Sequence, residues 1–518
     1  MSSPARLLEG LPARAVTLQG EVLRAAADPD AILGLHERVQ GAGYALELLL
    51  ALDRRAELEV FELVYLYQEA RGPGVVEITV ALPAQPRPSF PSLATRCFPA
   101  SRFEREIHDL FGLLPLGHPD LRRLVLHQFW PLDHFPLRQD APAVDPHDDG
   151  TPFPFQQVQG DGIYEIAVGP VHAGVIEPGH FRFSAVGETI VDLKPRLGFV
   201  HRGIEKLLEG RSPETAIELC ERISGDTAVG HALAFCEAIE LACGLEPPPR
   251  AALLRALCLE MERLYNHVSD LGFLAGDAGF GVGLADALAI KERLMRLNQR
   301  LTGHRLLRGS VVPGGVARDL PADLQLAVAL GALGRDFDKL VEMILGHSMV
   351  LDRLQGTGVL RRARAADLGV LGYVARGSGI DRDARRDRPA RGCEGLEPLV
   401  PVYQEGDVHA RARVRIDEFR ESLRLIDRIL KLLTPGELRR PLPAIRDGAS
   451  GFGMVEGWRG TIVHWVRVGR AGRLERVKIR DPSFLNWPAL PIALQDNIVP
   501  DFPLCNKSFN LSYAGSDL

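Results

Sequence analysis

The stretch PPRAALLRALCLEMERLYNHVSDLGFLAG, residues 248–276, indicates a long amphipathic helix, because its apolar side chains recur at helical spacing. A second segment, residues 415–433, keeps the same spacing and is stopped by the Thr-Pro-Gly that follows it. Strand-like runs flank these helices at residues 164–187 and 460–480. The larger part of the chain is therefore predicted to be a helix bundle with small β pieces at its ends.

The N-terminal part has a different pattern. A helical stretch at 31–40 precedes three strand-like runs at 44–52, 58–67 and 75–83, and a second helix is predicted at 101–112. Gly, Pro and charged turns separate these runs, so we expect a small α+β unit. The fold class of the whole chain is accordingly α+β.

A Pro- and Asp-rich segment without apolar periodicity, APAVDPHDDGTPFPF, connects the two parts. We therefore predict an α+β domain over residues 1–145, a linker over 146–160 and a mainly helical domain over 161–518.

The composition is that of a globular protein of two or three domains, with 518 residues, 46% hydrophobic and 25% charged. A net charge of −6 without a basic tail argues against a nucleic-acid partner. No apolar run reaches the length of a membrane span, so membrane contact is expected only through partners. The seven cysteines form no C-x-x-C pair and MSSPARLLEGLPAR lacks a signal-peptide core, which indicates a cytoplasmic chain with reduced thiols.

Several motifs follow one another along the chain. In order they are FEREIHDLFGLLPLGHPDLRRL (103–124), GPVHAGVIEPGHFRF (169–183), HRGIEK (201–206), MERLYNHVSDLGFLAGDAGF (261–280), GYVARGSGIDRDARRD (372–387) and EGWRGTIVHWVRV (456–468). From the second onward they resemble the large subunits of membrane-bound, energy-converting nickel-iron hydrogenases of the hydrogenase-4 and formate hydrogenlyase type. They also resemble the related 49-kDa quinone-site subunit of respiratory complex I. The first is similar to the signature of the 30-kDa docking subunit of complex I.

This chain departs from that family at the metal ligands. The resemblance places Ser224 and Thr227, in ERISGDTAVGH, where the active hydrogenases have two cysteines. It places Ser483 and Asn486, in DPSFLN, where they have the other two. Nickel and iron in such sites are held by thiolates, which hydroxyl and amide groups do not replace. We therefore expect no metal and no directly bound cofactor, with an iron-sulfur cluster in a partner subunit.

The resemblance also marks polar residues around the former metal position. Glu205 matches a proposed proton carrier of the hydrogenases, and Arg459 matches an arginine held over their active site. With His201, His231 and Asp226 they are predicted to form a protonatable, catalytic cluster, because a carboxylate buried beside His and Arg has a tunable pKa. The alternative is a buried ion pair that only holds helices in register.

A quinone site is the other property that the resemblance implies. His172 and His180 lie in a loop, HAGVIEPGH, that is longer than its complex I counterpart, and the Tyr of that family's cavity has no matching residue. Three further signals are discounted. The run GFGVG lacks dinucleotide-binding spacing, the His, Cys and Glu residues between 172 and 236 fit no zinc motif, and the basic run RDARRDRPAR (382–391) is interpreted as a solvated loop or docking surface.

Together these features predict a peripheral subunit on the inner face of the cell membrane, in a complex related to complex I and to energy-converting hydrogenases. It would pack against an iron-sulfur small subunit and membrane subunits that translocate ions, and couple redox or protonation changes to them. One alternative is a quinone-reducing, NADH dehydrogenase-like subunit, favoured by an open cavity lined by Glu205, His201 and Arg459. The other is a structural scaffold, favoured by a cavity filled by Phe484 and Trp487.

Overall fold

The computed structural model describes residues 13–19, 21–173, 176–390 and 392–518, and the chain divides into two compact units. The first unit runs to Gln157 and also takes Leu197–His201 and Asp517, while the second holds the remainder. The described residues between 141 and 159 form no helix or strand, in the region where the sequence predicts a linker. Most of the N-terminal segment considered for a signal peptide lies outside the described residues.

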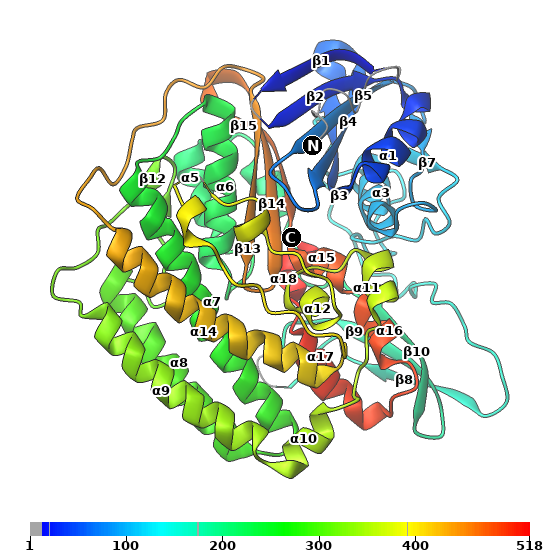
Figure 1. The fold of residues 1–518 in the computed structure, drawn as a ribbon. Coiled ribbons are helices and arrows are strands. Elements are labelled where there is room, and N and C mark those ends of the chain that lie inside the picture. The colour runs from blue at the N-terminus through cyan, green and yellow to red at the C-terminus, as the bar shows by residue number, and fades with distance from the viewer. Residues whose placement is uncertain (1–12, 20, 174–175, 391) are drawn as a thin grey trace. The chain divides into compact units, whose positions relative to one another are not determined.

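The first unit is built on a five-stranded sheet with the order β1-β2-β5-β4-β3, in which only the β2–β5 pair is parallel (Figure 1). Its strands are β1 (Ala13–Gln19), β2 (Val22–Ala27), β3 (Tyr44–Arg54), β4 (Val60–Glu69) and β5 (Val75–Pro83). Its helices are α1 (Ile32–Gly41), α2 (Arg55–Leu58) and α3 (Phe98–Phe111), and two short strands, β6 (Ser89–Pro91) and β7 (Leu114–Leu116), pair in parallel. The three predicted strands and two predicted helices are confirmed, and β1 and β2 were missed.

Charged residues of the motif at 103–124 form hydrogen bonds with neighbouring loops of this unit. Glu104, on α3, accepts hydrogen bonds from the Ser92 hydroxyl at 2.5 Å and the Leu93 amide at 2.7 Å. Further along the helix, the Asp109 carboxylate accepts the amides of Val125 and Leu126. The charged residues of this motif therefore brace the loops on either side of α3.

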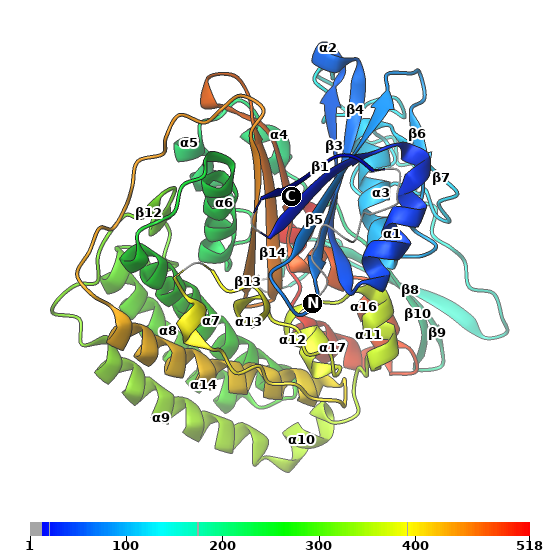
Figure 2. The same ribbon diagram turned by 45° about the horizontal axis from the view of Figure 1, so that its top comes forward.

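The second unit contains two three-stranded antiparallel sheets and a group of long helices (Figures 1 and 2). Its strands are β8 (Ile163–Val168), β9 (His180–Val186), β10 (Thr189–Arg196), β11 (Val311–Val312), β12 (Gly315–Val316), β13 (Ser450–Gly457), β14 (Gly460–Val468) and β15 (Leu474–Arg480). Its longer helices are α6 (Ala228–Cys243), α7 (Pro249–Asp277), α8 (Gly281–Thr302), α9 (Leu326–Leu345) and α14 (Val408–Leu432). Its shorter helices are α4 (Ile204–Leu208), α5 (Pro213–Cys220), α10 (Ser348–Leu354), α11 (Arg362–Leu368), α12 (Gly372–Gly377), α13 (Ala384–Asp387), α15 (Pro482–Asn486), α16 (Ala489–Leu494), α17 (Phe502–Phe509) and α18 (Tyr513–Asp517).

The predicted architecture of this part is confirmed. The long helix expected at 248–276 is α7, and the one expected at 415–433 corresponds to α14, which begins seven residues earlier and ends at Leu432, before Thr-Pro-Gly. The strand-like runs at 164–187 and 460–480 are hairpins of the two sheets. Helix α7 packs against α8 and α14, and α8 packs against α9, so the helices form layers beside the sheet β13–β14–β15.

Close packing of α6 on that sheet depends on two glycines of β13. A Cβ atom on Gly453 would lie 2.0 Å from the carbonyl oxygen of Ala234, and one on Gly451 would lie 2.2 Å from that of Ala238. Only glycine lets the helix backbone rest this closely on the strand. The contact brings α6 against the sheet that carries His464, on β14.

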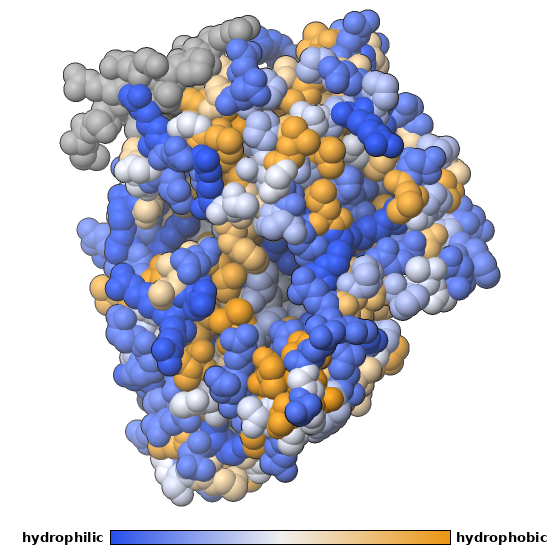
Figure 3. Space-filling model, turned by 90° about the vertical axis from the view of Figure 1, so that its right-hand side faces the viewer, coloured by the Kyte–Doolittle hydropathy of each residue, from blue (hydrophilic) through white to orange (hydrophobic). Residues whose placement is uncertain are grey.

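No helix among the described residues is both long enough and apolar enough to cross a membrane. On the face drawn in Figure 3, hydrophobic residues are interspersed with hydrophilic ones.

Candidate functional site

The four positions that the resemblance predicts to correspond to the cysteine ligands of the hydrogenases are buried in the second unit. Ser224 and Thr227 lie in the turn before α6, and Ser483 and Asn486 lie on α15. Ser512, just before α18, joins the two pairs: its hydroxyl is 2.8 Å from the Ser224 hydroxyl, and its amide donates to Ser483 Oγ at 2.9 Å. The C-terminal turn therefore lies between the two segments that carry these positions.

The other two positions are also engaged in hydrogen bonds. Thr227 Oγ1 accepts the Trp458 indole N–H at 3.1 Å, and the Asn486 amide bonds both the N–H and the C=O of Leu371. A donor set of three hydroxyls and one amide, each with a protein partner, does not fit nickel and iron, which need soft thiolates. No group of three or more His, Cys, Asp or Glu side chains in the described ranges is arranged to hold a metal ion.

An ion pair stands beside these positions. The Arg459 guanidinium, in the β13–β14 turn, binds both carboxylate oxygens of Asp226 at 2.6 and 2.7 Å. It also donates to the Asn510 carbonyl and stacks over the Trp458 ring at 3.9 Å. Burial alone would raise the pKa of Asp226, but Arg459 and two hydroxyl donors lower it to about 2. The Asp226 side chain keeps 38% of its surface exposed and that of Arg459 only 5%, so solvent reaches the pair from the carboxylate side.

A pH effect on stability follows from this pair. Folding lowers the pKa of Asp226 from 3.8 to about 2. The ion pair therefore contributes its full stabilisation at pH values above 3.8, the pKa of the unfolded chain, and loses it as the pH falls through about 2. We expect the difference in unfolding free energy between wild type and Asp226→Asn to be constant above about pH 5 and to shrink between about pH 4 and pH 2. Urea titrations across this range measure it. A difference that does not change with pH would contradict the assignment.

His231 belongs to a second polar group at the same end of α6. Its Nε2 lies 3.0 Å from Asp481 Oδ2, and its Nδ1 lies 3.0 Å from Nε2 of His464. Asp481 also caps α15 by accepting the Ser483 amide at 2.7 Å. Asp481 and Arg459 interact electrostatically, so this group and the Asp226 pair are neighbours.

Glu205 is held by different partners. Its carboxylate contacts Lys478 at 3.0 Å and Arg476 at 2.7 Å, and it accepts the Ile479 amide at 3.0 Å, all from β15. Burial would raise the pKa of Glu205, but the two cations and the amide lower it. This geometry favours an ionised carboxylate that ties α4 to β15, which is the ion-pair interpretation of the sequence.

The remaining predicted residues lie in other surroundings. His201 belongs to the first unit, where its Nδ1 lies 2.7 Å from the Asp517 carbonyl oxygen. His172 and His180 bond backbone carbonyls of their own loop, at Gly179 and Gly169. Two residues of that loop, 174 and 175, are outside the described residues. The structure thus brings together Asp226 with Arg459 and His231 with Asp481.

Sequence reasoning missed a further carboxyl group at this site. Glu262, on α7, accepts the amides of Val229 and Gly230, near the start of α6, at 2.7 and 3.0 Å. Burial raises its pKa to about 8, against the lowering effect of these amides. Glu262 lies inside the motif MERLYNH, but the sequence of this motif does not indicate that the Glu262 side chain faces the start of another helix. Asp481 was similarly overlooked beside the DPSFLN positions.

A network of ionisable side chains extends from the site into the helix layers. Arg376, fully buried on α12, binds Glu418 at 2.6 Å and Glu456 at 2.9 Å. Glu418 accepts His267 Nε2 at 2.8 Å, and the His267 ring lies 6.2 Å from that of Trp458. The other members of the network are Glu260, Arg263, Asp383 and Arg385.

This network corrects the interpretation of the run 382–391 as a solvated loop or docking surface. Asp383 is fully buried, and Arg385 binds it at 2.7 Å and binds Glu260 at 3.1 Å. The acidic partner Glu260 stands more than a hundred residues away in the sequence, on α7. A local charge pattern cannot show such a partner, so Asp383 and Arg385 were wrongly taken as solvated, whereas Arg391 lies outside the described residues.

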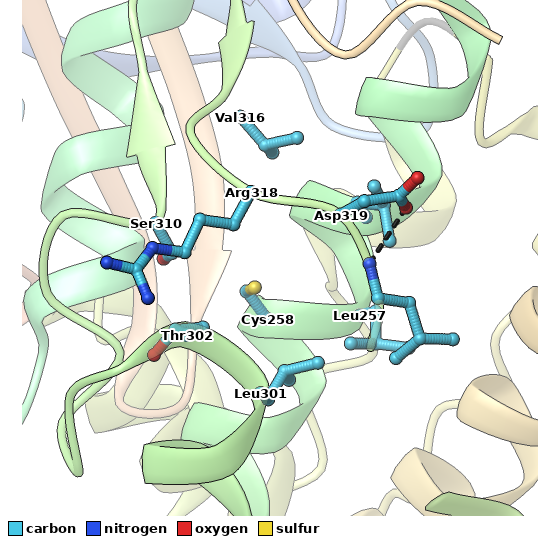
Figure 4. A pocket seen from close by; sticks show the side chains of 10 residues that line it. Leu257, Cys258, Leu301, Thr302, Ser310, Val316, Arg318 and Asp319 are labelled. Carbon is cyan, nitrogen blue, oxygen red and sulfur yellow. Dashed lines mark hydrogen bonds between the residues drawn. The ribbon is translucent and has the colours of Figure 1, made fainter. Parts of the chain in front are cut away.

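A small pocket lies on another part of α7 (Figure 4). Its volume is about 20 Å³, which is room for about one water molecule. It is lined by Leu254, Leu257, Cys258, Leu301, Thr302, Ser310, Val316, Arg318, Asp319 and Leu320. None of these residues belongs to the site described above, and the size excludes an organic substrate.

Three known protein families match successive stretches of the chain. The family described as "Respiratory-chain NADH dehydrogenase, 30 Kd subunit" matches residues 25–147. The family described as "Nickel-dependent hydrogenase" matches residues 202–273, and "Respiratory-chain NADH dehydrogenase, 49 Kd subunit" matches residues 277–447.

Individual relatives span most of the chain. Formate hydrogenlyase subunit 5 of Escherichia coli (strain K12) is 35% identical over 442 residues, covering 83% of this chain and 77% of the relative. A subunit of the NADH-quinone oxidoreductase of Methylococcus capsulatus is 29% identical, covering 74% of this chain and 68% of the relative. Among solved structures, a chain of the membrane-bound sulfane sulfur reductase, an archaeal respiratory membrane complex, superposes with a TM-score of 0.65 at 29% identity. That match covers 69% of this chain and 99% of the other.

Proposed function

Because the chain belongs to the family of large subunits shared by membrane-bound hydrogenases and complex I-type oxidoreductases, we propose that it is a peripheral subunit of such a complex without nickel-iron chemistry of its own. On this proposal it lies at the inner face of the cell membrane, against an iron-sulfur small subunit and membrane subunits that translocate ions. It couples redox or protonation changes at the small subunit to ion translocation.

One observation carries the proposal. At the four ligand positions the chain has hydroxyl and amide groups that are tied to Ser512, Trp458 and Leu371, and beside them stands the Asp226–Arg459 pair. Ionisable groups beside positions without thiolates suit the movement of charge and protons rather than metal chemistry. The network around Arg376 extends that set of ionisable groups from the site toward α14.

The burial of Phe484 and Trp487 weighs against the quinone alternative and favours the scaffold alternative. A quinone in the former metal cavity needs open space, whereas Trp487 is 1% exposed and donates to the Ser512 carbonyl, and Phe484 is 6% exposed. A scaffold without chemistry has no need of an ion pair that solvent can reach, such as Asp226–Arg459. Buried ion pairs, however, can have the purely structural role of holding helices in register. The scaffold is therefore the alternative to test against.

To test whether nickel chemistry is absent, the complex is purified from membranes by means of an affinity tag on this chain. We expect far less than one nickel per chain and no hydrogen evolution, because hydroxyl and amide donors do not hold nickel through purification. Elemental analysis and a hydrogen-evolution assay measure both. A content close to one nickel per chain would refute the proposal.

A measurement of ion translocation in vesicles distinguishes a subunit that couples redox changes to ion movement from a structural scaffold. The double variant Asp226→Asn/Arg459→Met removes both charges together, which is milder than breaking the pair from one side. We expect complexes with this variant to assemble but to lose redox-driven ion uptake, while complexes with wild-type chain retain it. Uptake equal to wild type in an assembled double variant would establish the scaffold instead.

A further inference from the structure

We propose that the start of α11, which carries Arg361, Arg362 and Arg364, is a docking surface for an acidic segment of a partner protein. These three side chains are called the α11 arginines below. That the partner is a subunit of a membrane-anchored complex rests on the proposed function. The docking surface itself does not, because it is defined by the arginines of this chain.

The α11 arginines are exposed and carry charges that nothing in the chain balances. All three are exposed to solvent, and among the described residues none of their side chains has an ion-pair or hydrogen-bond partner. Guanidinium groups stay protonated in proteins, so three positive charges stand within residues 361–364. The same helix offers a single carboxylate, Asp367. The surface is therefore strongly basic and free to bind carboxylates of another molecule.

These charges stand where a helix favours the opposite sign. The N-cap position favours Ser, Thr, Asp or Asn, and the first turn favours acidic residues. Helix α11 has Arg361 at its N-cap, no side-chain cap and no acidic residue in its first turn. The arginines also repel one another. A turn that is arranged against its own local stability in this way is typical of a segment with a function.

The backbone that presents the α11 arginines is held firmly. Just before the helix, the Gly358 amide donates to Asn497 at 3.0 Å, and the Gly358 carbonyl accepts from Arg411 at 2.9 Å. Within the helix, Ala365 is fully buried, and α11 packs against α12 and α16 (Figure 1). A surface that is fixed before binding loses little conformational entropy when a partner docks.

Helix α11 is also joined to the candidate site by a short stretch of chain. The amide of Leu371 donates to Asn486 at 2.8 Å, and the Leu371 carbonyl accepts from Asn486 at 3.2 Å. The next residue, Gly372, has a φ of 64°, and a Cβ atom there would overlap the carbonyl oxygen of Arg459. A partner on the α11 arginines therefore binds a segment whose other end contacts the site.

The exposed residues of α11 favour a protein partner over a lipid surface. Helices that lie on membranes insert bulky apolar side chains, whereas the exposed residues of α11 are arginines, alanines and one aspartate. Segments that bind anionic lipids by charge alone carry about four to eight basic residues. Three arginines beside a carboxylate fit a short run of Asp and Glu, with which guanidinium groups form paired hydrogen bonds.

The partner is tested by cross-linking in the complex purified through an affinity tag on this chain. The variant Arg361→Lys/Arg362→Lys/Arg364→Lys keeps the charges and supplies amines, which a carbodiimide joins to carboxyl groups in contact with them. We expect amide links from the introduced side chains to Asp or Glu of one partner protein, mapped by mass spectrometry. The proposal is overturned if they form no link while lysines elsewhere in the complex do, or if they link only within this chain.

The contribution of charge is measured with the glutamine variant, Arg361→Gln/Arg362→Gln/Arg364→Gln. We expect its dissociation constant for the partners recovered from the tagged complex to be about tenfold higher than that of wild type, because each exposed ion pair contributes up to a few-fold. The difference should shrink at high salt. Circular dichroism checks that the variant is folded. An unchanged dissociation constant in a folded glutamine variant would overturn the docking surface.

The matched control removes the same charge elsewhere. Arg87, Arg446 and Arg470 are exposed arginines whose side chains likewise have no ion pair among the described residues. Arg87→Gln/Arg446→Gln/Arg470→Gln should bind the partners as wild type does. A loss equal to that of the glutamine variant would mean that total charge, and not α11, governs binding, and would overturn the proposal.

Sedimentation of the full-length chain alone with phosphatidylglycerol vesicles tests the lipid alternative. We expect wild type and the glutamine variant to behave alike. If wild type binds these vesicles and the glutamine variant does not, the arginines serve a membrane surface and the proposal is overturned.

Failure of this inference and failure of the proposed function give different results. If the cross-links lead to a protein that belongs to no membrane complex, the docking surface stands and the proposed function fails. If the tagged chain purifies with membrane subunits but the glutamine variant binds them as well as wild type does, the docking surface fails and the proposed function stands.

Discussion

Replacing Glu205 by glutamine is expected to destabilise the second unit by about 3–5 kcal/mol, the usual cost of removing one partner of a buried ion pair. Arg476 and Lys478 keep their charges in the variant, and both lie within the unit at no more than 5% exposed. A glutamine can accept their hydrogen bonds but cannot balance either charge. Denaturant unfolding of wild type and Glu205→Gln, followed by circular dichroism, measures the loss.

Two companion variants separate charge from shape. Glu205→Asp keeps the charge on a chain one methylene shorter, so it should recover part of the stability. Glu205→Gln/Lys478→Met removes a cation together with the carboxylate and should be more stable than Glu205→Gln alone. If the glutamine variant is as stable as wild type, Glu205 is not ionised in the folded chain.

The same pair of variants addresses proton transfer by Glu205. If it is a working carrier, complexes with Glu205→Asp should translocate ions far better than complexes with Glu205→Gln, since general acid–base groups contribute about 10²–10⁴-fold. If folded Glu205→Gln complexes translocate as well as wild type, the carboxylate is structural. The two cations around Glu205 and its lowered pKa favour this second result.

A loss of similar size, about 3–5 kcal/mol, is expected for Glu418→Gln. Glu418 is fully buried and meets Arg376 at 2.6 Å, His267 at 2.8 Å and Arg263 at 3.6 Å. Arg376 and Glu418 hold each other in their charged forms against the effect of burial: the pKa of Glu418 lies well below its ordinary value and that of Arg376 lies above. Removing the carboxylate leaves two buried guanidinium groups short of negative charge. Urea unfolding of the variant measures the effect.

The control for this prediction is an ion pair at the surface. Asp338 and Arg420 are 2.9 Å apart, but their side chains are 53% and 48% exposed. Asp338→Asn should cost less than about 1 kcal/mol, because solvent replaces the lost partner. Equal losses for Asp338→Asn and Glu418→Gln would show that burial does not govern the cost in this chain.

Most of the fold could be predicted because its elements have clear periodicity. The helix at 248–276 and the strands of the first unit each carry a regular apolar pattern over enough residues to be recognised. Strand β2 was missed because its sequence, VLRAAA, contains three consecutive alanines, a residue that favours helices over strands.

The site could be predicted only in part, because its contacts join residues far apart in the sequence. Asp226 and Arg459 were both named as candidates and the structure pairs them, but 233 residues separate them in the sequence. The partners of Glu205 stand more than 270 residues away on a strand without any motif for them. Ser512, which joins the two altered segments, carries no sequence signal at all.

Ser512 also bears on how this chain and a metal-binding relative could be interconverted by mutation. Cysteines restored at 224 and 483 would each face a Ser512 atom within hydrogen-bond distance, so the space between them is taken by the backbone turn before α18. A metal ion placed between cysteines at these two positions would have to displace Ser512 and the turn that carries it.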